Sequence, residues 1–290
     1  MNFQDYSPIR SKTLSEAIAQ IRQHIAGLTD TPGLDAQVLM AYVCNKDRTW
    51  VLAHPEYEIS AEETLRMADV LAQIYAGIPL PYVIGEWEFY QLPFKITPNV
   101  LIPRPETELL VEYALNWLRA HPESRRVAEA GTGSGCISVS IAVNLPGVHI
   151  TATDISPDAV AVAEKNAEMH QVSDRVHLHV NDLLAGIPGP FDLICANLPY
   201  IPSASLRKLP VYMREPTLAL DGGKDGLSVI GQLLEQASHK LAPGGLMLLE
   251  IEAGHPEEAK ALAARFFPEA KIRTKLDLAG HHRLLILENV

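Results

Sequence analysis

The sequence is short of cysteine and of positive charge. Its three cysteines, Cys44, Cys136 and Cys195, lie far apart and form no C-x-x-C pair. A disulfide framework or a structural zinc site is therefore not expected, and a reducing compartment fits best. Lysine and arginine number 24 against 35 acidic residues, which gives a net charge of −11. Proteins that bind a nucleic-acid backbone over a broad face are usually basic, so we expect no direct nucleic-acid partner.

Long apolar runs are also missing. No uninterrupted run approaches the ~20 residues that a membrane-spanning helix needs, so no membrane partner is expected. The sequence begins Met-Asn-Phe-Gln-Asp, without the basic start and apolar stretch of a signal peptide. Hydrophobic residues make up 47% and charged residues 20% of the 290 residues, a composition that fits a globular protein and excludes a disordered chain. These features predict a cytoplasmic protein of one or two domains.

The first 80 residues predict a small all-helical domain. Thr13 with Glu16, and Ser60 with Glu63, have the spacing of capping boxes, which begin helices. Apolar residues recur three and four positions apart after each box, as on the buried face of a helix. Helices are therefore expected over 14–28, 31–45 and 60–74.

Residues 81–104 differ from the helices before them. Proline and glycine interrupt short segments rich in Trp, Phe, Tyr and Ile, of which 86–90 and 93–97 have the character of strands. We therefore expect a β-hairpin that links two domains.

Residues 105–290 alternate between strands and helices. Strands are expected over 126–130, 148–153, 175–180, 191–196 and 246–251, with closing strands over 271–276 and 283–288. Helices are expected near 106–119, 135–144, 157–169, 226–241 and 256–266. This alternation predicts an α/β domain with a doubly wound, Rossmann-like, largely parallel sheet that helices cover on both faces.

A glycine-rich turn follows the first of these strands. Residues 129–135 read Glu-Ala-Gly-Thr-Gly-Ser-Gly and lie where the strand passes into a helix. Glycines at such a point let the backbone turn tightly and approach a ligand that a Cβ would block. The spacing is G-x-G-x-G, and Cys136 stands where a dinucleotide fingerprint would have glycine or alanine.

Two acidic residues follow the next two strands. Asp154 ends the second strand, where a carboxylate can accept hydrogen bonds from both hydroxyls of a ribose. Asp182 follows the third strand, in a position to meet the edge of an adenine. The alternative for Asp154 is that it only caps the helix that begins near Pro157. A glycine turn with a ribose-binding acid indicates an adenosine cofactor, but does not separate NAD from S-adenosylmethionine.

An apolar strand over 191–196 runs directly into Asn197-Leu198-Pro199-Tyr200, called the tetrad below. In a parallel sheet, the tetrad opens into the same crevice as the glycine turn. The side-chain oxygen of Asn197 and a nearby backbone carbonyl can accept both hydrogens of a planar NH2 group, while the ring of Tyr200 lies against that group. Such a nitrogen is a poor nucleophile, so positioning for in-line attack on a methyl sulfonium supplies much of the rate without a strong general base. The alternative is an ordinary strand-ending turn, which Asn and Pro both favour.

Several segments together resemble a known family. They are the glycine turn, the tetrad, Leu-Ile-Pro-Arg-Pro-Glu-Thr-Glu at 101–108, Glu-Pro at 215–216, Asp-Gly-Leu at 225–227 and Leu-Ala-Pro-Gly-Gly at 241–245. Over nearly its whole length, the sequence resembles the class I S-adenosylmethionine-dependent methyltransferases. Within that class, it is similar to the N5-glutamine methyltransferases that act on peptide chain release factors.

The resemblance implies a reaction and a set of site residues. A methyl group would pass from S-adenosylmethionine to the side-chain amide nitrogen of the glutamine in the Gly-Gly-Gln motif of release factors, the expected partners. The helical domain would recognise this protein substrate, residues 104–108 would form a wall of the site, and a monomer is expected. Catalytic and substrate-binding roles fall to Asn197, Leu198, Pro199 and Tyr200. Cofactor-binding roles fall to Glu129, Gly131, Thr132, Gly133, Ser134, Gly135, Asp154, Asp182, Leu183 and Asn197.

Two positions depart from the family pattern. Leu198 replaces the first proline of Asn-Pro-Pro-Tyr, but the expected contribution there is a backbone carbonyl, which leucine also has. Glu129 stands where aspartate is commoner, and its longer side chain would shift the contact to the methionine amino group of the cofactor. Neither change removes a group with a chemical role, so an active enzyme is expected.

Other functions stay open at the level of sequence. A ribosomal-protein glutamine, or more distantly the amine of adenine in DNA, is an alternative acceptor. A non-catalytic adaptor would bind the cofactor without using Asn197, and a nicotinamide oxidoreductase fits least. His177 and His179 share one face of a strand but have no third ligand at a plausible spacing, so no metal site is expected.

Overall fold

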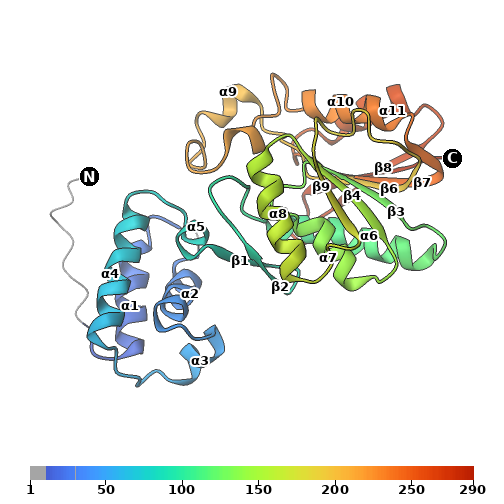
Figure 1. Ribbon diagram of the computed structural model, residues 1–290. Coiled ribbons are helices and arrows are strands. Elements are labelled where there is room, and N and C mark those ends of the chain that lie inside the picture. Colours follow the sequence, from blue (N-terminus) through green and yellow to red (C-terminus); the bar gives the residue numbers. More distant parts are fainter. Residues whose placement is uncertain (1–10, 30) are drawn as a thin grey trace. The chain divides into compact units, whose positions relative to one another are not determined.

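The computed structural model describes residues 11–29 and 31–290. The chain divides into two compact units, residues 1–85 and 86–290, and Figure 1 colours the sequence from blue through green and yellow to red. Each unit has a hydrophobic core made from its own residues. Across the described ranges, no helix combines the length and the apolar character that crossing a membrane requires.

The first unit is a helical bundle. Its helices are α1 (Leu14–Ile25), α2 (Pro32–Cys44), α3 (Arg48–Ala53), α4 (Ala61–Tyr75) and α5 (Leu80–Ile84). Both predicted capping boxes are confirmed, at Thr13 before α1 and at Ser60 before α4. Apolar faces of α1, α2 and α4 meet in a core that includes Leu14, Ile21, Leu39 and Met67. The two short helices α3 and α5 were not expected, because neither is long enough to show a periodic apolar face.

The predicted hairpin is present but packs on the second unit. Strands β1 (Glu86–Phe89) and β2 (Leu92–Lys95) pair antiparallel. The side-chain amide of Asn166 accepts a hydrogen bond from the Lys95 N–H at 2.7 Å and donates one to the Lys95 carbonyl at 3.0 Å. These bonds fix β2 to a helix of the second unit, and the two compact units divide after Gly85.

The second unit contains a seven-stranded sheet in the order β5-β4-β3-β6-β7-β9-β8. Its strands are β3 (Arg126–Ala130), β4 (His149–Asp154), β5 (Val176–Val180), β6 (Phe191–Ala196), β7 (Leu241–Glu250), β8 (Lys271–Leu276) and β9 (His282–Glu288). The first five strands in chain order run parallel, and β9 pairs antiparallel with both β7 and β8. The predicted largely parallel, doubly wound sheet is confirmed.

Helices cover both faces of this sheet, as Figure 1 shows. They are α6 (Glu108–Ala120), α7 (Cys136–Asn144), α8 (Pro157–Met169), α9 (Ser203–Leu206), α10 (Ser228–Ala237) and α11 (Pro256–Phe266), with 3-10 turns η2 (Pro105–Thr107) and η3 (Thr217–Ala219). Helices α10 and α11 bury their apolar residues on one face, together with side chains of β3, β6, β7 and β9. The central strand β6 reads as an almost unbroken apolar run because it is buried on both faces.

One boundary differs clearly from its prediction. Strand β7 begins at Leu241 and not at residue 246, because Leu241 pairs with Phe191 and, after a register shift, Leu246 pairs with Leu193. The Gly244 N–H donates to the Asn289 carbonyl at 2.8 Å, and the Asn289 N–H donates to the Gly245 carbonyl at 2.9 Å. The Ala-Pro-Gly-Gly composition indicates a turn, and tertiary pairing draws it into the sheet.

Candidate active site

The site lies where the strand order of the sheet reverses. Strand β3 has β4 on one side and β6 on the other, and Ala130, the last residue of β3, pairs with Ala196, the last residue of β6. The glycine turn and the tetrad therefore leave the sheet side by side, at the switch point where open α/β sheets bind ligands. A cavity of about 400 Å³ opens there, a size that suits a small organic ligand.

Most of the predicted site residues line this cavity. They are Glu129, Gly131, Thr132, Gly133, Ser134, Asp154, Asp182, Leu183, Asn197, Leu198 and Pro199. Gly135 and Tyr200 are not part of its wall. Pro103, Arg104 and Thr107 also line the cavity, so the segment expected to wall the site does so.

The glycine turn depends on missing side chains at two points. Gly131 has φ +71°, and a Cβ there would lie 2.8 Å from Cδ2 of Leu198, so the two loops approach more closely than a larger residue allows. Gly135 has φ +78°, and a Cβ there would meet Ala163 of α8 at 3.1 Å. Gly131 thus brings the turn against the tetrad, whereas Gly135 packs the start of α7 against α8 and lies off the cavity wall.

Glu129 is a buried carboxylate that uses only one of its two oxygens in hydrogen bonds to the described residues. Oε2 accepts hydrogen bonds from the Thr132 hydroxyl at 2.8 Å, from the Ser138 N–H at 3.1 Å and from the Ser138 hydroxyl. Oε1 is buried, and none of the described residues forms a hydrogen bond with it. Removal from water raises the pKa of Glu129 to about 7, against the lowering effect of the Ser138 and Thr132 hydrogen bonds. A cationic ligand group in the cavity would satisfy Oε1 and favour the ionised carboxylate.

Asp154 holds the far side of the turn. Its Oδ2 accepts from the Gly133 N–H at 2.8 Å, and its Oδ1 accepts from the Ser156 N–H at 2.9 Å. The cap of α8 is Ser156, whose hydroxyl accepts from the Ala159 N–H at 3.2 Å, so capping does not account for Asp154. Burial raises the pKa of Asp154. Its carboxylate oxygens keep further lone pairs for ligand hydroxyls in the cavity.

Asn181 and Asp182, which follow β5, make different contacts. Asp182 is exposed and lines the cavity beside Leu183. The amide of the preceding Asn181 donates to the carbonyl oxygens of Leu183 at 3.0 Å and Ala185 at 2.9 Å, so it holds the loop. Asp182 is thus the member of the Asn-Asp pair that faces a ligand.

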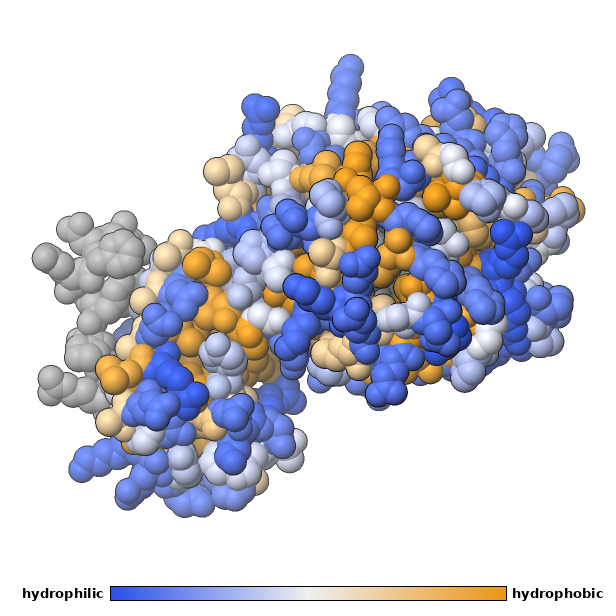
Figure 2. Space-filling view, viewed as in Figure 1, coloured by the Kyte–Doolittle hydropathy of each residue, from blue (hydrophilic) through white to orange (hydrophobic). Residues whose placement is uncertain are grey.

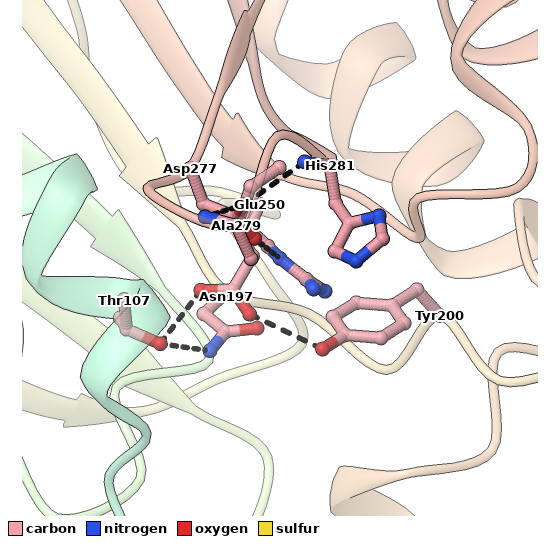
Figure 3. Close-up of polar contacts among 8 residues, drawn as sticks. Thr107, Asn197, Tyr200, Glu250, Asp277, Ala279 and His281 are labelled. Atoms are coloured by element: carbon pink, nitrogen blue, oxygen red, sulfur yellow. Dashed lines mark hydrogen bonds and ion pairs between the residues drawn. The ribbon is translucent and has the colours of Figure 1, made fainter.

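Asn197 belongs to a buried chain of hydrogen bonds, which Figure 3 shows in full. Its Nδ2 donates to the Thr107 hydroxyl at 3.0 Å, and that hydroxyl donates to Oε2 of Glu250 at 2.6 Å. The other oxygen of Glu250, Oε1, accepts from the Tyr200 hydroxyl at 3.2 Å. Burial raises the pKa of Glu250, while its bonds from Thr107 and Tyr200 act in the opposite direction.

Tyr200 does not line the cavity expected to use it. Its hydroxyl is bound to Glu250, and its ring packs against the apolar core and lines a small hollow near Gly226 and Leu227. A Cβ on Gly226, which has φ +79°, would lie 2.3 Å from the Tyr200 carbonyl oxygen. The Asp-Gly-Leu segment therefore rests directly on the backbone of the tetrad, and glycine is required at its centre.

A partly buried ion pair joins two walls of the cavity. Glu215, which is 8% exposed, accepts from the Arg104 guanidinium through Oε1 and from the Ile102 N–H at 3.1 Å through Oε2. Arg104 and the neighbouring Pro216 both line the cavity. The two family-like segments at 101–108 and 215–216 thus form one structural clamp, although more than 100 residues separate them.

Two polar residues of the site were not predicted individually. Thr107 lies inside a segment expected to wall the site, but no role was assigned to its hydroxyl. Glu250 ends the apolar strand β7, just as Asp154 ends β4. An acidic residue at the carboxyl end of a core strand was therefore the available signal.

Solved structures share this fold at low sequence identity. A methyltransferase from Pyrococcus furiosus is 20% identical, with a TM-score of 0.52, covering 78% of this chain and 98% of that chain. A 16S rRNA methyltransferase from T. thermophilus, in complex with AdoMet and guanosine, is 18% identical, with a TM-score of 0.50 over 71% of this chain and 50% of that chain. A family model described as the methyltransferase small domain matches residues 106–209. The fold and the site define an S-adenosylmethionine-dependent methyltransferase.

Relatives of known name show which family of methyltransferases the chain belongs to. A family model for the PrmC N-terminal domain matches residues 14–85. The release factor glutamine methyltransferase of Moorella thermoacetica is 41% identical over 278 residues, which are 94% of this chain and 98% of the relative. That of Coxiella burnetii is 36% identical over 275 residues, again 94% and 98% of the two chains. The chain belongs to the release factor glutamine methyltransferase family.

Proposed function

We propose that this protein transfers a methyl group from S-adenosylmethionine to the side-chain amide nitrogen, N5, of the glutamine in the Gly-Gly-Gln motif of peptide chain release factors. The observation that carries the proposal is that Asn197 lines the same cavity as Glu129 and the glycine turn. The same cavity therefore places Asn197, which can bind an amide, beside the glycine turn, which can bind the cofactor. The names of the relatives supply the protein substrate.

The cavity has the groups that this cofactor needs. The buried and unpartnered Oε1 of Glu129 suits the methionine ammonium group, and the carboxylate of Asp154 suits the ribose hydroxyls. Gly131 and Gly133 let the turn approach the ligand without side chains in the way. Asp182 and Leu183 flank the position proposed for the adenine. When bound, the cofactor supplies an electrophilic methyl group on sulfur.

The tetrad promotes the reaction by holding the glutamine amide in a fixed orientation. The Asn197 side-chain oxygen and the Leu198 backbone carbonyl accept its two N–H groups, which fixes the plane of the amide. An amide nitrogen is a weak nucleophile, so holding it in line with the methyl group supplies a large part of the rate. The nitrogen becomes acidic as it gains the methyl group, so the excess proton leaves without a strong base. Leucine at position 198 supplies the same carbonyl as proline would.

The helical unit is proposed to recognise the release factor. It has a core of its own that includes Leu14, Ala36 and Val70, so its fold does not depend on closing the cavity. The cavity itself is lined only by residues between 98 and 232. A separately folded unit outside the cavity is suited to hold a protein substrate at a distance from the reacting glutamine.

Methylation of an intact release factor tests the proposal. The protein is incubated with methyl-labelled S-adenosylmethionine and purified factor, and the labelled residue is mapped by mass spectrometry. Label is expected on the glutamine of Gly-Gly-Gln. Asn197→Ala is expected to lower turnover by about 100-fold, because an oriented acceptor for the reacting amide is lost. Its cofactor affinity, measured by calorimetry, should stay within about threefold of wild type.

The controls separate the remaining alternatives. A factor whose motif glutamine is replaced by alanine should accept no label. Label on a ribosomal-protein glutamine and none on the release factor would assign the other acceptor. Full biological function in Asn197→Ala, without methyl transfer by the wild-type protein, would identify a non-catalytic adaptor and overturn the proposal.

A further inference from the structure

We propose that Thr107 and Glu250 are positioning residues that fix which end of the Asn197 amide faces the reacting glutamine. This inference rests on the proposed function, since it concerns the same amide recognition. It adds two residues to the site that act on the substrate only through Asn197. The chain of contacts is drawn in Figure 3.

The direction of each hydrogen bond in the chain follows from its members. With Glu250 as the carboxylate, the form that the bonds from Thr107 and Tyr200 and the charge of Arg283 favour, its oxygens can only accept hydrogen bonds. The Thr107 hydroxyl then donates its single proton to Oε2 of Glu250, at 2.6 Å. The Thr107 oxygen is then left as an acceptor, and it accepts from Nδ2 of Asn197 at 3.0 Å. The amide is thereby held with its NH2 end toward Thr107 and its oxygen, Oδ1, directed away from Thr107.

This orientation decides whether Asn197 can bind the substrate. A glutamine amide presents two N–H donors, so it needs an acceptor on the enzyme. A half-turn of the Asn197 amide would exchange Oδ1 and Nδ2 and set donor against donor. The two ends of an asparagine amide have nearly the same shape, so packing alone does not select between them. The Thr107 oxygen supplies the selection.

The supporting groups are buried and rigidly placed. Thr107 and Glu250 are each 2% exposed, and they come from the turn before α6 and the end of β7. The Tyr200 hydroxyl binds the second oxygen of Glu250 at 3.2 Å, which holds the carboxylate in place. Burial disfavours the ionised form of Glu250, whereas its hydrogen bonds from Thr107 and Tyr200 and the positive charge of Arg283 favour it. Removing any one member of a hydrogen-bond chain in such a buried place leaves its neighbours without partners, which costs free energy.

Threonine variants test the inference with little change in shape. Thr107→Val keeps the volume and removes the acceptor, so turnover of release factor is expected to fall by about 10- to 100-fold. Thr107→Ser keeps the hydroxyl and should stay within about threefold of wild type. Affinity for S-adenosylmethionine should be unchanged in both variants. Thr153→Val is the matched control, because Thr153 is fully buried on β4 and its hydroxyl binds only the Glu129 carbonyl, at 3.3 Å.

A second readout does not depend on methyl transfer. In wild-type protein, the side-chain NH2 resonances of Asn197, assigned by their absence in Asn197→Ala, should exchange slowly with water. Thr107→Val should remove that protection, and Thr107→Ser should retain it. Wild-type turnover in Thr107→Val, or unprotected Asn197 amide protons in wild type, would overturn the positioning role. Absence of release-factor methylation by the wild-type protein would overturn the proposed function, and the exchange data would still decide the amide orientation.

Discussion

At the scale of single residues, Glu129 is the carboxyl group of the cavity whose ionisation should respond most directly to a bound cation. Its carboxyl is fully buried, and burial raises its pKa to about 7, so near neutral pH it is close to half ionised in the free protein. The free Oε1 has no donor among the described residues. Binding of an ammonium group supplies that donor and favours the ionised form, so cofactor binding and proton release are linked.

Cofactor affinity should therefore rise with pH. Between pH 5.5 and pH 7, the ionised fraction of Glu129 in the free protein rises, and S-adenosylmethionine should bind roughly tenfold more tightly at the upper end. Calorimetry in two buffers of different ionisation enthalpy measures both the affinity and the released proton. Glu129→Gln should bind more weakly, with little dependence on pH across this range.

A ligand without the amino group provides the control. 5′-Methylthioadenosine lacks the methionine ammonium, so its affinity should change little between the same two pH values. An equal pH dependence for both ligands would place the titrating group elsewhere, with Asp154 the nearest candidate since burial raises its pKa as well.

At the scale of elements, Asn166 joins three pieces of the second unit. From α8, it makes two hydrogen bonds to the backbone of Lys95 in β2 and donates a third to the Ser134 carbonyl in the glycine turn at 2.8 Å. Its side chain is fully buried. The hairpin and the glycine turn are therefore held by one amide.

Removing this amide should destabilise the fold. Asn166→Leu removes the partner of the Lys95 N–H, of the Lys95 carbonyl and of the buried Ser134 carbonyl, so the free energy of unfolding should fall by about 2–5 kcal/mol. Chemical denaturation of the full chain measures the loss. Asn144→Leu is the comparison, because Asn144 is exposed and donates only to the Ser140 carbonyl at 2.9 Å, and it should cost less than about 1 kcal/mol. Similar losses in both variants would contradict the role given to Asn166.

At the scale of the whole molecule, the proposed function assigns recognition to one unit and chemistry to the other. The helical unit and the α/β unit have separate cores, and the cavity is built from the second unit alone. If the first unit holds the release factor, its removal should affect substrates according to their size.

A truncated chain tests this division of labour. Residues 86–290 should bind S-adenosylmethionine within about threefold of the full-length affinity, because every cavity residue is retained. Methylation of intact release factor should fall by about 100-fold, since the second point of attachment is lost. Methylation of a short Gly-Gly-Gln peptide, which cannot reach both units, should change little. Undiminished activity on the intact factor would remove the recognition role from the first unit.

Local sequence patterns predicted the elements and part of the site. The capping boxes at Thr13 and Ser60, the strand–helix alternation and the glycine turn each depend on neighbours a few residues apart. Asp154 and Asn197 were found because strand ends in a parallel sheet share one edge, which places them on the cavity. The same rule applied to β7 would have indicated Glu250.

The amino-acid sequence by itself determined the fold class, the position of the glycine turn and the place of Asn197 at the cavity, because each follows from short-range pattern and strand order. Tertiary structure alone decided what these residues touch. It turned the Tyr200 hydroxyl onto Glu250, joined Arg104 to Glu215, and set Thr107 against Asn197. Such contacts link segments about 50 to 110 residues apart, and their geometry exists only once the sheet has brought the strand ends together.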